Sequence, residues 1–245
     1  MINKTEETMK KEILQILQEI NEAHDPQKIE ELIWRALEID SHDPMVLLLA
    51  AEFSHDPYER LSFLDHGIRH LEHHLAEEDM FSQANFEQLA THPLGDILVK
   101  NIALRFNTFM DLNYLHQAIN EYVQLTSLEG NDVHDDARGV MASLYIGYFE
   151  LAQDIYNGYE SAPFTIAYPY SVFLYKQGHE KEALGIFENL LDYVPNLKDY
   201  FLKLSYGETP IAESEEDYAL LNTLLQTSSL TPDAFSNLVI PINNN

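Results

Sequence analysis

The sequence contains no cysteine, which excludes disulfide bonds, cysteine-ligated zinc sites and thiol catalysis. Glycine and proline are also scarce, with 9 and 10 in 245 residues. So few chain breakers favour long regular elements over many tight β-turns. No apolar run approaches the ~20 residues of a membrane span. Residues 1–20 lack the continuous apolar core of a secretory signal. We therefore expect a cytoplasmic protein with no membrane-embedded part.

Basic residues are scarce as well. The chain has 14 Lys and Arg against 41 Asp and Glu, a formal net charge of -27. Between Asn107 and Tyr175 the only basic residue is Arg138, whereas nine residues are acidic. Nucleic acids and anionic membranes both require clustered Lys and Arg, so we expect neither as a partner. The acidity favours solubility first. The alternatives are a basic protein partner or mimicry of nucleic-acid charge.

The hydrophobic residues are spaced as in helices. Ile13, Leu17 and Ile20 form a stripe on one face of a first helix. Three Asp-Pro pairs, at residues 25–26, 43–44 and 56–57, each predict a helix start, because Asp caps free amides and Pro fits the first helical position. We expect further helices at 79–89, from 93 onward, and at 113–125, 135–146, 149–156, 170–177, 180–193, 197–204, 215–225 and after 232. Pro163 and Pro169 are expected to break the chain before residue 170, and no strand alternation is present.

Small residues recur at a fixed distance from a turn. In three places a turn residue precedes an alanine by five positions: Asn113 and Ala118, Gly147 and Ala152, Gly178 and Ala183. The three alanines are 34 and 31 residues apart, close to the ~34-residue period of one class of helical repeat. Glycine permits a sharp turn, and alanine lets two helices approach closely.

This pattern, with Phe187 after Ala183 and Pro195 closing the unit, resembles the tetratricopeptide repeat over residues 27–196. The repeat's Trp and first-helix Gly are absent. Residues 36–60 are also similar to bacterial tetratricopeptide proteins of the suppressor-of-tumorigenicity-7 type. The resemblance implies an all-α fold, a right-handed superhelical stack of antiparallel helix pairs. We expect this α-solenoid to span residues 1–207, with a C-terminal helical cap and flexible tail at 208–245.

A stack of helix pairs presents a concave surface. We predict a non-enzymatic scaffold without a cofactor, which binds a protein or peptide of basic character in this groove. In the register set by Gly178, the groove residues are Asn107, His134, Tyr168 and Tyr175. The tyrosines near them, including Tyr156 and Tyr159, either line the groove or pack in the core, and Tyr170 is assigned to the core.

Histidines supply the main alternative. His66, His70 and His74 repeat at i, i+4 on one helix face, a spacing that can chelate zinc. A metal-dependent helical hydrolase is therefore a second hypothesis, although the Glu of a zincin helix is missing between His66 and His70. The competing interpretation is a solvated polar face. A structural module that dimerises through its end helices is a third hypothesis.

Overall fold

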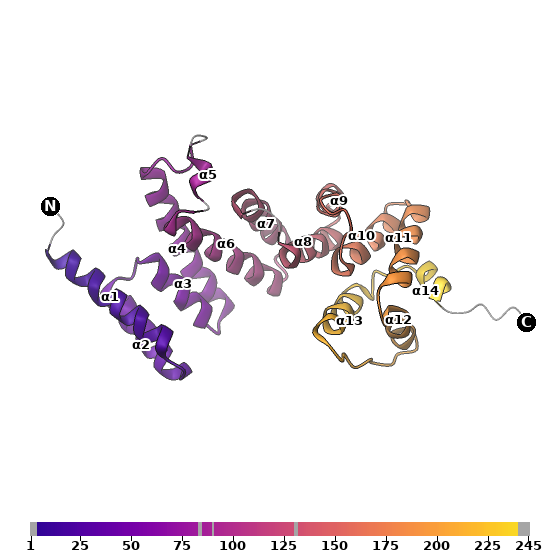
Figure 1. Cartoon of the computed structure of the whole chain (residues 1–245), viewed down its shortest axis with the longest axis horizontal. Coiled ribbons are helices and arrows are strands. Elements are labelled where there is room, and N and C mark those ends of the chain that lie inside the picture. The colour runs from indigo at the N-terminus through magenta and orange to yellow at the C-terminus, as the bar shows by residue number, and fades with distance from the viewer. Residues whose placement is uncertain (1–3, 83–84, 90, 130–131, 240–245) are drawn as a thin grey trace, which may run out of the picture. The chain divides into compact units, whose positions relative to one another are not determined.

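The structure is a computed structural model that describes residues 4–82, 85–89, 91–129 and 132–239 (Figure 1). Every regular element in these ranges is a helix, which confirms the predicted all-α class. Within the same ranges, no helix has both the length and the hydrophobicity needed to cross a membrane. The predicted flexible tail falls partly on residues 240–245, which lie outside the described residues.

The chain forms two compact units, Met1–Asn131 and Asp132–Asn245. The first contains α1 (Lys4–Glu22), α2 (Pro26–Ile39), α3 (Pro44–Phe53), α4 (Pro57–Glu77), α5 (Phe86–Leu89), α6 (Pro93–Asp111) and α7 (Leu115–Glu129). The second contains α8 (Val133–Ile146), α9 (Phe149–Asn157), α10 (Phe164–Lys176), α11 (Glu180–Tyr193), α12 (Leu197–Ser205), α13 (Glu215–Thr227) and α14 (Asp233–Val239). The predicted boundary after residue 207 falls inside the second unit.

The Asp-Pro pairs start helices as predicted. The carboxylates of Asp25, Asp43 and Asp56 accept hydrogen bonds from backbone amides two residues ahead, at 3.1, 2.9 and 2.9 Å. In each case proline occupies the start of the helix, where its missing N–H costs nothing.

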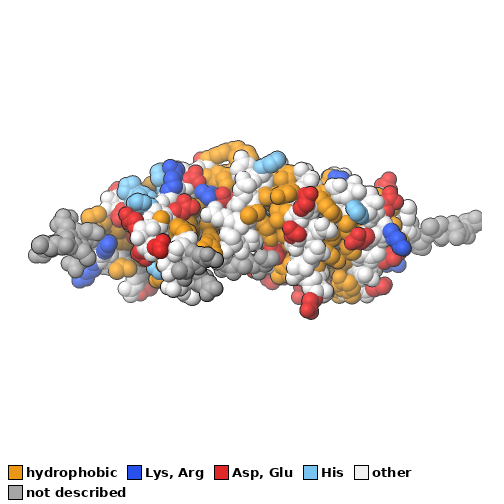
Figure 2. Space-filling model, turned by 90° about the horizontal axis from the view of Figure 1, so that it is seen from above, with side chains coloured by type: hydrophobic (Ala, Val, Ile, Leu, Met, Phe, Trp, Pro, Cys, Tyr) orange, Lys and Arg blue, Asp and Glu red, His pale blue; other side chains and the backbone are white. Residues whose placement is uncertain are grey.

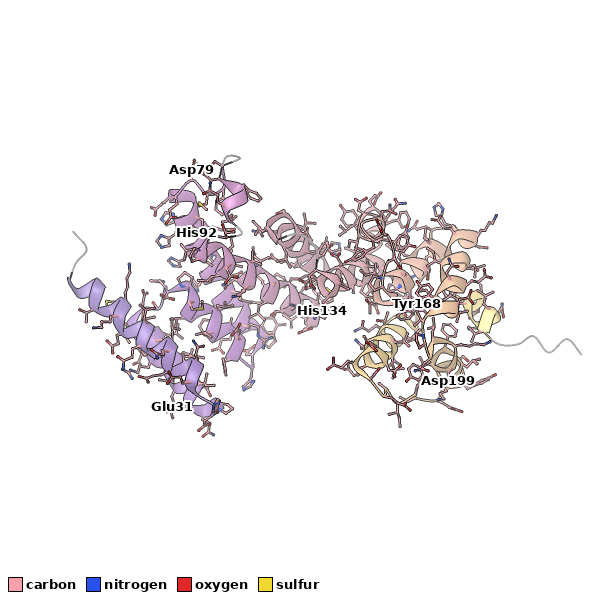
Figure 3. All side chains as sticks on the ribbon, viewed as in Figure 1. Glu31, Asp79, His92, His134, Tyr168 and Asp199 are labelled. Atoms are coloured by element: carbon pink, nitrogen blue, oxygen red, sulfur yellow. The ribbon has the colours of Figure 1, made fainter. Side chains whose placement is uncertain are left out.

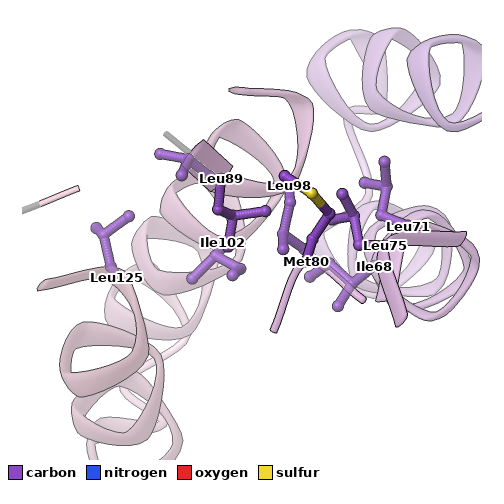
Figure 4. Close-up of a cluster of buried hydrophobic side chains, with 9 residues drawn as sticks. Ile68, Leu71, Leu75, Met80, Leu89, Leu98, Ile102 and Leu125 are labelled. Carbon is purple, nitrogen blue, oxygen red and sulfur yellow. The ribbon is translucent and has the colours of Figure 1, made fainter. Parts of the chain in front are cut away.

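Hydrophobic side chains of α4 and α6 form the main core of the first unit (Figure 4). Ile68, Leu71 and Leu75 of α4 belong to the same buried cluster as Leu98 and Ile102 of α6. A polar clamp joins these helices to α7. The guanidinium of Arg105 donates to Asp65 of α4 at 2.9 Å and to Glu121 of α7 at 2.7 Å.

The recurring alanines behave as expected. Ala118, Ala152 and Ala183 are fully buried, each on the second helix of a packed pair: α6 with α7, α8 with α9, and α10 with α11. Their turn residues are all left-handed, with φ of 60° at Asn113, 80° at Gly147 and 87° at Gly178. Asn113 thus adopts the conformation that glycine adopts in the other two turns.

Two predicted elements were wrong. Helix α10 begins at Phe164 and continues through Pro169, because every residue from Ile166 to Leu174 is buried. Burial on all sides offsets the one backbone hydrogen bond that proline removes, which costs about 3 kcal/mol in an exposed helix. The helix predicted at 79–89 is reduced to α5, four residues long.

Candidate functional site

The four predicted groove residues are divided between the two units. Asn107 lies on α6 of the first unit and is half-buried, whereas the other three belong to the second unit. His134 is exposed in the first turn of α8, where its amide donates to the capping carboxylate of Asp132 at 2.8 Å (Figure 3). Tyr168 and Tyr175 share one face of α10, as their spacing predicts, and both rings contact Phe235 of α14.

Tyr168 is a core residue, which corrects its assignment to an open groove. Its side chain is fully buried where α10 meets the C-terminal helices (Figure 3). Its hydroxyl makes a hydrogen bond with Thr231 at 2.9 Å, and its ring packs on Phe187 with centroids 5.7 Å apart. Burial raises the pKa of Tyr168 to about 12. The face of α10 predicted to bind a ligand is therefore covered by α13 and by Phe235 of α14.

The histidines on α4 contact another histidine and a glutamate. The ring of His70 packs at a tilt against His42 from the turn between α2 and α3, with ring centroids 4.8 Å apart, while His73 and His74 both approach Glu77. Across the part of the chain that the structure describes, no three His, Asp or Glu side chains could hold a metal ion. Burial, followed by the charges of neighbouring histidines, lowers the pKa of His70.

A groove in the second unit gathers tyrosines and carboxylates. Tyr156 of α9, Tyr159 of the following connection and Tyr193 of α11 line it together with Glu160 and Asp192. The apolar side chains that contribute to the groove are Ala162, Ala167 and Ile186. Its volume is about 280 Å³, slightly below the roughly 300–1,000 Å³ of most small-molecule sites. The groove therefore has room for a side chain and not for a large cofactor.

Contacts beneath the groove hold its tyrosines in place. The Tyr159 hydroxyl donates to the buried carboxylate of Asp136 on α8 at 2.6 Å. The Tyr156 ring stacks on Tyr170, with centroids 4.3 Å apart and planes 21° apart. Tyr170 is buried, which confirms its assignment to the core.

The electrostatics of this groove favour a positively charged ligand. Burial raises the pKa of Tyr156 and, with the hydrogen bond to Asp136, that of Tyr159, so both hydroxyls stay protonated at neutral pH. Neutral tyrosine rings present electron-rich faces to cations. The described residues that line the groove include two acidic side chains and no Lys or Arg. Lys and Arg are also sparse on the surface shown in Figure 2.

The sequence pointed to Tyr156 and Tyr159 but missed Glu160, Asp192 and Tyr193. These residues come from separate segments, and only the packing of α9 and α11 on α10 brings them together. The repeat pattern gives no signal for Tyr193, because Tyr156 follows Ala152 by four residues whereas Tyr193 follows Ala183 by ten.

Comparison of the chain with protein-family models, with curated proteins and with solved structures found no match.

Proposed function

We propose that the protein is a non-enzymatic binding scaffold whose second unit binds a basic protein segment. A Lys or Arg side chain of the partner occupies the groove between α9 and α11, over the tyrosine rings and beside Glu160 and Asp192. The observation that carries this proposal is the convergence of three tyrosines and two acidic side chains on a groove lined by no basic residue that the structure describes.

The expected energies are small for one side chain. A partly exposed cation–π contact is worth about 0.5–1 kcal/mol, and an exposed ion pair about 0.2–1 kcal/mol. One basic side chain that makes both contacts therefore gains roughly 0.7–2 kcal/mol, and about 1.4 kcal/mol corresponds to a tenfold change in affinity. A stable complex requires a segment with several basic residues. The net charge of -27 assists by speeding the encounter with such a segment.

The wider proposal is that the helix pairs stack as in tetratricopeptide repeats, with the predicted right-handed superhelix. A left-handed turn residue followed five positions later by a buried alanine supports it in three successive pairs. Because α13 and Phe235 of α14 cover one face of α10, the partner binds on the side where α9 and α11, the second helices of two pairs, are exposed.

Fluorescence anisotropy of a short labelled peptide of arginine and serine tests this proposal. The double variant Glu160→Gln, Asp192→Asn should bind at least about fivefold more weakly at ~0.05 M salt. Its control, Asp154→Asn with Glu188→Gln, removes the same charge from exposed positions of α9 and α11 that do not line the groove. Equal losses in both variants, or binding unchanged at ~0.5 M salt, would exclude a specific cation site here.

A further inference from the structure

A second groove lies in the first unit and is more apolar than the first. It is formed by α2, the end of α3 and the start of α4, with a volume of about 260 Å³. The buried side chains of Ile33 and Ala50 line it beside the half-buried Leu37. The volume suits a single large side chain rather than a cofactor.

Exposed aromatic residues also line this groove. Trp34, the only tryptophan of the chain, is 49% exposed, and its ring meets Phe63 edge-on with centroids 6.5 Å apart. Phe53 at the end of α3 is 37% exposed. Single exposed hydrophobic residues are ordinary, but aromatic residues that gather around a groove mark a binding surface. Tryptophan is also among the residues most enriched at the energetic centres of interfaces.

Acidic side chains accompany the aromatic residues. Glu30 and the helix-capping Asp56 line the groove, and Glu59 is held by a hydrogen bond from Ser54 at 2.8 Å. No Lys or Arg appears among the described residues that line it. Arg60, one residue beyond Glu59, donates to the carbonyls of Ala51 and Ser54 at the end of α3. The groove therefore combines an apolar interior with a negative edge.

We infer that this groove binds a basic amphipathic segment of a partner protein, with one large apolar side chain inserted beside Trp34 and flanking Lys or Arg side chains on the acidic edge. Charge complementarity selects this occupant, because an acidic edge repels acidic partners and attracts basic ones. The inference does not depend on the tyrosine groove of the second unit, which accepts a charged group instead of an apolar one.

Trp34 is itself the probe for the test. Because the chain has no other tryptophan, excitation selective for tryptophan reports on this groove alone. Titration with a short peptide that carries two leucines between lysine pairs should shift the Trp34 emission to shorter wavelength and saturate. Peptides with alanine in place of leucine, or glutamate in place of lysine, should bind at least about tenfold more weakly. A response to all three peptides, or to none, would refute the inference.

A matched pair of charge reversals locates the site. Glu30→Lys should weaken the leucine–lysine peptide at least about fivefold, whereas Glu31→Lys, on the same helix but not lining the groove, should change its affinity less than about twofold. Equal effects would overturn the inference. An emission shift that depends on protein concentration without peptide would also overturn it, since a second copy of the chain would then be the occupant.

Variants of the second unit separate this inference from the proposed function. The Trp34 response should be unchanged in the Glu160→Gln, Asp192→Asn protein, which loses only the tyrosine-groove acids. If that variant abolishes the Trp34 response, the first-unit groove is not an independent site. If it keeps the response but still binds the arginine–serine peptide normally, the proposed function fails and this inference stands.

Discussion

Truncation of Phe235 should destabilise the second unit more than any change to its exposed aromatic residues. Phe235 is fully buried on a helix of seven residues. Its ring stacks on Phe187 with centroids 4.5 Å apart and meets the edges of Tyr168 and Tyr175. A buried Phe→Ala substitution costs about 3–5 kcal/mol. Because so short a helix has little stability of its own, Phe235→Ala should also release α14.

Urea unfolding followed by far-UV circular dichroism measures this loss. In a unit of this size, about 3 kcal/mol corresponds to a fall in melting temperature of at least about 10 °C. Hydrogen exchange should show faster exchange over residues 233–239 and over α10. Tyr218→Ala on α13 is the control, because Tyr218 is 68% exposed and should cost less than about 0.5 kcal/mol. A loss below about 1 kcal/mol for Phe235→Ala would refute the view that this ring anchors α14 on α10.

Three further predictions concern the turns and the titrating groups. Asn113→Ala should lower the free energy of unfolding by about 1 kcal/mol, whereas Asn113→Gly should not, because the backbone at this position is left-handed. Gly178→Ala should cost a similar amount through its backbone conformation alone, since the added Cβ would meet open space. The urea midpoints of the three variants measure these changes. Burial, then the neighbouring histidines, lowers the pKa of His70, so His42→Ala should raise it partway toward 6.5 in an NMR titration; no change would contradict an effect of the His42 contact on His70. Burial raises the pKa of Glu121 despite its arginine partner, so its stabilising contribution is complete below 4.5 and is lost as the pH rises through the raised pKa. Glu121→Gln should therefore gain stability relative to the unaltered protein as the pH rises from 4.5 through the raised pKa in urea unfolding, and the opposite trend would show that the ion pair outweighs burial.

The features that sequence reasoning predicted correctly depend on residues close together in the chain. An Asp-Pro pair starts a helix through a hydrogen bond between residues two apart. The paired helices were predicted from a turn residue and an alanine five positions later, again a local pattern. Such patterns keep their meaning in most tertiary settings, because the backbone geometry that they satisfy is the same in each.

The misplaced features depend on residues far apart in the chain. Tyr168 was assigned to a groove, but Thr231 and Phe235, more than 60 residues later, cover it. Pro169 was expected to break the chain, but α10 is buried by helices on both sides of it in the sequence. No residue near Tyr168 in the sequence indicates that the seven-residue α14 packs against it. The tyrosine groove was partly missed for the same reason.

The turn after α11 shows whether the left-handed turn residue or the small residue five positions later decides how closely two helices pack. Asn196 is left-handed, with φ of 60°, like the three hairpin turns before it. Five positions later the chain has Phe201 in place of alanine, and its ring lies against Phe187 of α11 with centroids 5.3 Å apart. Consequently α11 and α12 lie close over a much shorter stretch than α10 and α11, and α12 packs on α14 and α13 as well. A left-handed turn alone therefore does not produce a close hairpin: the three left-handed turns that join closely packed helices are each followed at the fifth position by a buried alanine, which lets the two helices approach.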